Sequence, residues 1–137
     1  MSNGYKPKFN PGERKGKPGG GASNPDVAAA VKDGLSQDFM NKVENFAGKF
    51  QASNSQVRNI FTAVKRLQDK GFEHEAFLML RPRLAYATQR DFKLKPLKEV
   101  LSPAVDEVLK ADDKDEREKR FNRFCLCCEA ILAYARK

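Results

Sequence analysis

The stretch FNRFCLCCEAILAYA, residues 121–135, decides the fold class of this 137-residue chain. Its apolar residues recur at intervals of three and four positions, which places them on one face of a helix for about four turns. They are Phe121, Phe124, Cys125, Cys128, Ile131, Leu132 and Ala135. Acidic residues precede the stretch, and negative charge suits the N-terminal end of a helix. The pattern therefore predicts a long C-terminal helix that packs on other helices.

The same helical spacing occurs in five segments upstream. They are residues 26–34, 36–50, 73–90, 94–110 and a segment that starts at Ser53 or Ser55 and ends before Gly71. Asp26 and Ser36 have the side chains that N-cap positions favour. No segment shows the alternation of a β-strand. We predict an all-α fold, a compact bundle of five to six helices in a single domain, residues 26–137.

Two prolines modify this prediction. Pro82 lies inside the segment 73–90, where the missing N–H and the ring should bend or break the helix. Pro103 follows Ser102 in the segment 94–110, a pairing typical of a helix start. We therefore expect Ser102 to be an N-cap and Pro103 the first residue of a new helix.

Residues 1–25 differ from the rest of the chain. They hold six of the nine glycines, four of the seven prolines, five basic residues and one acidic residue. Such a segment cannot bury enough apolar surface to offset its ordering entropy. We predict a disordered basic tail, which is either a solvated leader or an auxiliary attachment to a polyanion.

Nothing in the sequence indicates an enzyme, a metal site or a cofactor. The one histidine, His74, lacks the partners of a catalytic group, and the acidic residues 112–118 lack the ligand spacing of a calcium loop. Cys125 and Cys128 fall on the apolar face and are expected to be buried, whereas Cys127 lies off it and is expected to be partly exposed. Without a disulfide framework, a signal peptide or a membrane span, we expect a cytoplasmic protein.

The basic residues form the one coherent constellation. The net charge is +8, and residues 58–98 hold ten basic residues against four acidic ones. On the segment 73–90, Leu80, Leu84 and Ala87 share one stripe and Arg83, Tyr86 and Arg90 another. We expect Tyr86 to be a core residue, with stacking on a base or sugar as the alternative. The composition favours a helical bundle that binds nucleic acid, although a free-standing DNA-binding regulator and a protein-interaction scaffold remain open.

Three motifs in this order resemble a known family. They are SQVRNIF at residues 55–61, LRPRLAYA at residues 80–87 with Arg90, and the stretch from Phe121 to Tyr134. Over residues 36–137 the chain resembles the small helical subunit of the type III-A CRISPR interference complex, the Csm effector. The resemblance implies a non-catalytic subunit in antiviral defence that supports the duplex of guide RNA and target RNA through sequence-independent backbone contacts. It also implies that the partners are other effector subunits and copies of the chain in a short filament, with no membrane.

On this resemblance we expect basic side chains to hold RNA phosphates. The predicted RNA-binding residues are Arg58, Lys65, Arg66, Arg81, Arg83, Arg90, Arg120 and Arg123. The last two are equally suited to contacts between subunits. The acidic segment 112–118 is assigned to a solvent-facing edge or a neighbouring protein.

Overall fold

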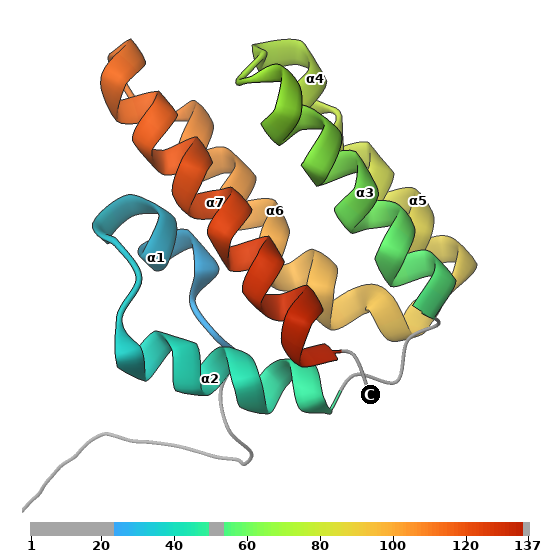
Figure 1. Cartoon of the computed structure of the whole chain (residues 1–137). Coiled ribbons are helices and arrows are strands. Elements are labelled where there is room, and N and C mark those ends of the chain that lie inside the picture. The colour runs from blue at the N-terminus through green and yellow to red at the C-terminus, as the bar shows by residue number, and fades with distance from the viewer. Residues whose placement is uncertain (1–23, 50–53, 136–137) are drawn as a thin grey trace, which may run out of the picture.

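The computed structural model describes residues 24–49 and 54–135, and every regular element in them is helical (Figure 1). The elements are α1 (Val27–Asp33), α2 (Gln37–Gly48), α3 (Asn54–Lys70), α4 (His74–Leu78), α5 (Leu80–Arg90), the 3₁₀ turn η1 (Phe92–Leu94), α6 (Lys95–Leu109) and α7 (Lys114–Ala135). With α4 and α5 taken as the one interrupted segment expected there, six predicted helical segments are present. The all-α prediction is confirmed. Nearly all of the predicted tail, and the positions Phe50 and Ser53, lie outside the described residues.

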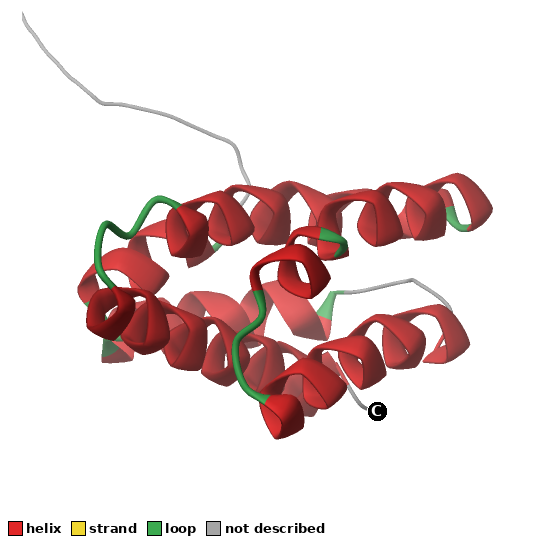
Figure 2. Cartoon of the chain, turned by 90° about the horizontal axis from the view of Figure 1, so that it is seen from above, coloured by secondary structure: helices red, strands yellow, loops and turns green. Residues whose placement is uncertain are grey.

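The four helices α3, α5, α6 and α7 form the centre of the bundle. Each contacts two of the others, so that α3 packs on α7, α7 on α6, α6 on α5 and α5 on α3. In Figure 1, α3 and α7 lie in front of α5 and α6, and the view from above in Figure 2 shows the two layers. Helix α1 packs on α6 and α7, and α2 packs on α7. Helix α7 is therefore covered from several directions.

The local signals at the first two helices act as predicted. The Asp26 carboxylate accepts a hydrogen bond from the backbone N–H of Ala29 at 3.0 Å, and the Ser36 hydroxyl accepts one from Phe39 at 3.1 Å. Each bond satisfies one of the donors that a helix start leaves without a partner. Helix α3 is followed by Gly71 at φ 90°, a conformation that a side chain would strain.

An aromatic cluster holds the turn after α3 against α7. Phe77 of α4 is fully buried, and its ring lies 5.5 Å from that of Phe121 and 5.1 Å from that of Phe124, between centroids. Both pairs are edge to face, the arrangement that the ring quadrupoles favour. The ring of Phe72 lies 5.6 Å from both Phe77 and Phe121. These contacts fix where α5 begins relative to α3 and α7.

The break expected near Pro82 occurs, three residues before the proline. Helix α4 ends at Leu78 and α5 begins at Leu80, with Met79 as the junction. Pro82 is then the third residue of α5, where a backbone N–H has no partner inside the helix. The proline therefore lies in a first turn that tolerates it.

The prediction for Pro103 is wrong, because α6 runs without interruption from Lys95 to Leu109 and contains it. Pro103 itself is exposed, so its ring faces solvent, and water can reach the Glu99 carbonyl that loses its helical partner. On the opposite side, the buried residues Leu101, Ala104 and Val105 hold the helix in the core. Packing outweighs the local preference for a new helix start.

The prediction for Cys127 is also wrong. Its side chain is fully buried, as are Cys125 and Cys128 to within a few per cent, and all three thiols are free. Helices α1, α2, α3 and α6 all contact α7. Together they bury a wider face of α7 than the apolar stripe predicted from spacing. A residue off the predicted stripe thus still enters the core.

Candidate nucleic-acid interface

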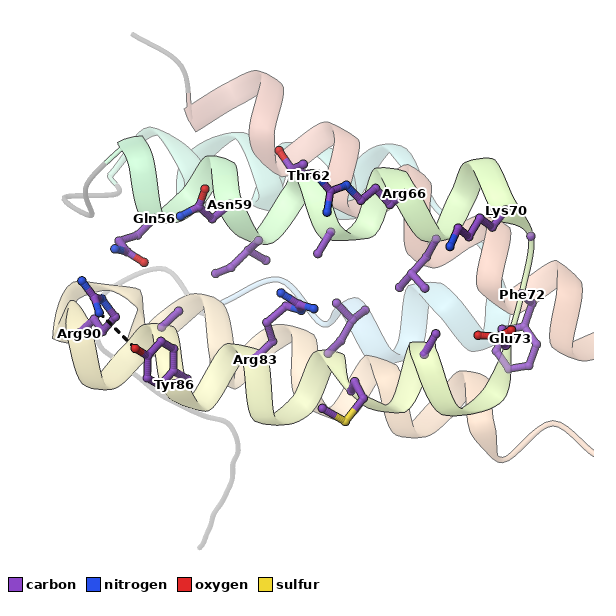
Figure 3. A pocket seen from close by; sticks show the side chains of 18 residues that line it. Gln56, Asn59, Thr62, Arg66, Lys70, Phe72, Glu73, Arg83, Tyr86 and Arg90 are labelled. Carbon is purple, nitrogen blue, oxygen red and sulfur yellow. Dashed lines mark hydrogen bonds between the residues drawn. The ribbon is translucent and has the colours of Figure 1, made fainter.

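A groove with a volume of about 770 Å³ runs between α3 and α5 (Figure 3). We call it the basic groove, because four of the residues that line it are cationic and one, Glu73, is acidic. The cations are Arg66 and Lys70 of α3 and Arg83 and Arg90 of α5. In Figure 3, Arg83 points from α5 towards α3. The groove thus gathers side chains from two helices that are separate in the sequence.

The apolar faces of the two helices orient these side chains. Val57, Ile60 and Val64 of α3 are buried, as are Leu84 and Ala87 of α5. Side chains at the intervening positions must therefore project away from the core. Arg83 and Arg90, on the stripe of α5 that the sequence separates from the apolar one, are exposed, and so is Tyr86 on the same stripe.

The positive charge of the groove is not neutralised within the described part of the chain. None of the ion pairs formed there involves Arg66, Arg83 or Arg90. Glu73 lies beside Phe72, at the end of the groove far from Arg90 (Figure 3). Side chains of one sign in a concave surface concentrate the field and attract anions. The basic groove is therefore suited to a polyanion, and guanidinium groups suit phosphate in particular.

The prediction of a core position for Tyr86 is wrong, since 60% of the residue is exposed. Its hydroxyl oxygen accepts a hydrogen bond from Nη1 of Arg90 at 3.1 Å. The Arg90 guanidinium carbon also lies 5.8 Å from the centre of the Tyr86 ring, within range of a cation–π contact. Helical spacing places Tyr86 with Arg83 and Arg90, away from Leu84 and Ala87, which fill the core side of α5. The core position was expected from the frequent burial of tyrosine in helical bundles, and that tendency does not hold here.

A second groove, of about 390 Å³, lies on the other side of α3, against α7. Arg58, Lys65 and Arg66 line it together with Glu129, and Cys125 and Cys128 belong to its wall. Lys65 forms an exposed ion pair with Asp69 at 3.6 Å, a type of pair that contributes little to stability. Since Arg66 lines both grooves, the basic residues of α3 form one ridge between them.

Arg81 lies apart from the basic groove. Its Nη1 donates to the Asp106 carboxylate of α6 at 3.2 Å, and both side chains are about half exposed. This pair joins α5 to α6 on the face that does not line the groove. A carboxylate partner already compensates the charge of this predicted RNA-binding residue.

Arg120 and Arg123 are engaged inside the molecule. The Arg120 side chain is 15% exposed and bonds to the Glu116 carboxylate at 2.8 Å, the Glu107 carbonyl at 2.8 Å and the Glu107 carboxylate at 3.3 Å. The hydrogen bond from Arg120 holds the pKa of the partly exposed Glu116 carboxyl below its usual value. Arg123 donates to the carbonyls at the end of α1. Both arginines therefore have structural roles that the sequence did not indicate.

Among the lining residues of the basic groove that were absent from the predicted set, three lie on one stripe with Arg66. Gln56, Asn59 and Lys70 line it with Arg66, and the four share one stripe of α3 at intervals of three, seven and four residues. The helical spacing of these four residues can be read from the sequence. However, the sequence does not say that α5 packs beside α3, and this packing is what makes their stripe the one that lines the groove. The structure thus adds two amides and one cation to the candidate site.

Other chemistry finds little support in residues 24–49 and 54–135. These residues contain no group of three or more His, Cys, Asp or Glu side chains placed to hold a metal ion. The acidic residues 112–118 lie at the start of α7, where the Asp113 carboxylate accepts a hydrogen bond from the backbone N–H of Glu116 at 2.7 Å. Among the helices described, none is long and apolar enough to cross a membrane.

The comparison with protein-family models agrees with the resemblance of the three motifs. The family model described as Csm2 Type III-A matches residues 35–137, three quarters of the chain. The searches of curated proteins and of solved structures returned no match. The match includes α2 to α7 and both helices of the basic groove. This chain therefore belongs to the Csm2 Type III-A family, the small subunit of the type III-A CRISPR effector complex.

Proposed function

We propose that the basic groove and the adjoining ridge of α3 bind the sugar–phosphate backbone of the guide RNA–target RNA duplex. The observation that carries the proposal is the row formed by Arg66, Arg83 and Arg90, exposed along one groove and outside every ion pair of the described residues. Bidentate guanidinium groups hold phosphate oxygens without reading the bases. In this proposal the subunit supports the duplex in antiviral defence and catalyses no reaction itself.

The ridge of α3 extends the proposed path. Arg58 and Lys65 line the second groove, and Arg66 lines both. An A-form duplex presents two phosphate backbones across its shallow minor groove, so a ridge with cations on either side matches its shape better than a single strand. The proposal leaves out Arg120 and Arg123, whose guanidinium groups have partners within the molecule, and gives Arg81 a minor role beside Asp106.

The proposed protein partners are other subunits of the effector and further copies of this chain in a short filament, in the cytoplasm. Family membership supports association with other subunits. The acidic residues 112–118, most of which are exposed, would be repelled by RNA and suit a basic surface on a neighbouring protein. This division gives the subunit one face for RNA and another for protein.

The test compares two triple variants of equal charge change. R66E/R83E/R90E reverses the basic groove, whereas K32E/K42E/K119E reverses three exposed lysines that line neither groove. Binding to a labelled guide–target RNA duplex is measured by fluorescence anisotropy at about 50 and 200 mM salt. We expect the wild-type protein and the lysine variant to bind, and to lose about 40-fold in affinity over this range if three phosphates are contacted. The groove variant should bind far more weakly at either salt concentration.

The same assay separates the alternatives. A DNA-binding regulator would prefer duplex DNA of the same sequence over RNA. A protein-interaction scaffold would bind neither, and its groove variant would assemble into the effector and support target-RNA cleavage as the wild-type protein does. Equal loss in both triple variants would show that net charge rather than the groove drives binding, and would overturn the proposal.

A further inference from the structure

The two ends of the basic groove differ in chemistry. At one end lie Gln56 and Asn59 of α3, opposite Tyr86 and Arg90 of α5 (Figure 3). This end offers two amides, a phenol and a guanidinium, all planar groups. The rest of the groove has Arg66, Arg83 and Lys70, which suit phosphate charge. Backbone binding explains the charged part, but it makes no use of the amide acceptors or of the face of the exposed ring.

The Tyr86 ring is exposed to solvent and is oriented by Arg90. It is 60% exposed, so packing within the described residues does not account for an aromatic residue at this position. Its hydrogen bond from Arg90 spans one turn of α5, and the guanidinium carbon lies 5.8 Å from the ring centre. Because the hydroxyl oxygen acts as acceptor to Arg90, its proton is directed elsewhere and can be donated. The Tyr86 ring therefore offers an exposed face in a defined orientation, and its hydroxyl can donate a hydrogen bond to a ligand.

The amides across the groove complement such a platform. A phosphate oxygen can use only the N–H donors of an amide, whereas the edge of a nucleobase can use its donors and its acceptor together. Aromatic side chains stack on bases that are not paired, and every base offers a face for this contact. Gln56 and Asn59 stand one turn apart on the stripe of α3 that faces α5.

Resting on the proposed function, we propose that this end of the groove binds an unpaired nucleobase of the RNA. The base stacks on Tyr86, and Gln56 and Asn59 hydrogen-bond to its edge. Arg90 holds the ring in place and contacts the adjoining phosphate. The subunit then distinguishes a duplex that carries an extrahelical nucleotide from one that is perfectly paired, without preference for the surrounding sequence.

The test uses two RNA duplexes that are identical except at one unpaired nucleotide. In one the nucleotide keeps its base, and in the other it is abasic, so the backbone charge is the same in both. The ratio of the two dissociation constants isolates the contribution of the base. We expect the full-length wild-type protein to bind the duplex with the base about five-fold more tightly or better.

Variants assign this preference to Tyr86. Tyr86→Ala should reduce the ratio to one, while Tyr86→Phe, which keeps the ring, should retain most of it. Phe92→Ala is the matched control, because Phe92 is a second exposed aromatic residue, 72% exposed, with Lys95 Nζ 5.5 Å from its ring centre, but it lies outside the groove. Arg83→Ala should weaken both duplexes equally and leave the ratio unchanged.

The outcomes distinguish this inference from the function on which it rests. A wild-type ratio of one, with strong salt-dependent binding of both duplexes, overturns the nucleobase site and leaves backbone binding intact. A ratio above one that Tyr86→Ala does not change, or that Phe92→Ala abolishes, also overturns it. Absence of binding to either duplex overturns both.

Discussion

Arg123 of α7 donates a hydrogen bond from Nη1 to the backbone carbonyl of Val31 at 3.1 Å, although 92 residues separate them in the sequence. The same nitrogen donates to the carbonyl of Lys32 at 3.0 Å. These carbonyls lie in the last turn of α1, where a helix leaves acceptors unpaired and where positive charge is favoured. A single side chain thus joins the first described helix to the last.

Arg123→Ala should lower the free energy of unfolding by about 1–2 kcal/mol, since two carbonyls lose a charged donor. Urea denaturation followed by far-UV circular dichroism measures the change. Lys119→Ala, at an exposed position of the same helix, is the control and should stay within about 0.5 kcal/mol of wild type. An equal change in the free energy of unfolding in both variants would contradict the structural role assigned to Arg123.

Arg120→Ala should destabilise the fold by about 2–3 kcal/mol, because it leaves two carboxylates and one carbonyl without their shared donor. Affinity for the RNA duplex should remain close to that of wild type when both are measured well below the unfolding transition. A folded Arg120→Ala protein that loses RNA binding would place this residue at the RNA interface, contrary to our proposal.

Pro103→Ala should raise the free energy of unfolding by about 1–2 kcal/mol. The alanine restores an N–H that can bond to the Glu99 carbonyl inside α6, a gain only partly offset by the greater freedom of the unfolded chain. Pro96→Ala is the matched control, because Pro96 lies in the first turn of α6, where a missing N–H is tolerated. Thermal unfolding of the two variants should therefore diverge, and a Pro96→Ala variant stabilised as much as Pro103→Ala would contradict this account.

The buried thiols should make the fold less stable at alkaline pH. Burial raises the pKa of the Cys125 thiol from 9.0 to about 11 and that of Cys127 to about 12. Below pH 9 these thiols are neutral in both the folded and the unfolded chain, so their full contribution to the free energy of unfolding is present. Above it the unfolded chain releases their protons first, and stability falls as the pH rises towards 11–12.

Urea denaturation at a series of alkaline pH values measures this effect. The slope of unfolding free energy against pH should be shallower in Cys127→Ala than in wild type, because one raised pKa is removed. Native thiols should also react with an aromatic disulfide reagent about 100-fold more slowly than thiols in urea, in proportion to the thiolate fraction. Equal slopes, or rapid reaction of the folded protein, would contradict the buried position of these side chains.

The helices themselves were predictable from local patterns. The caps at Asp26 and Ser36, the helix end at Gly71 and the buried stripe of Leu80, Leu84 and Ala87 all depend on residues within a turn or two of one another. The basic stripe of α5 was predictable for the same reason, since side chains that alternate with a buried stripe must face away from it.

Two of the three errors concern contacts between distant segments, and the third, at Tyr86, came from giving the usual burial of tyrosine more weight than helical spacing. Cys127 is buried because four other helices cover α7, and Tyr86 is exposed because the core beside α5 is already filled. Pro103 remains within α6 because the buried side of that helix is held by its neighbours. The burial of Cys127 and the continuity of α6 at Pro103 cannot be derived from the spacing of residues along one helix, whereas that spacing does place Tyr86 away from the buried stripe of α5.

The sequence alone is enough to predict the fold class, the helical segments, the family and the concentration of positive charge on residues 58–98. Which cations share a groove, which arginines bond within the molecule, and that Gln56 and Asn59 face Tyr86 and Arg90 follow from how the helices pack. Helical periodicity reports which side of each helix is apolar, but not which helix covers it. That choice depends on packing between segments that are far apart in the chain, and the candidate site is formed where two of them, α3 and α5, meet.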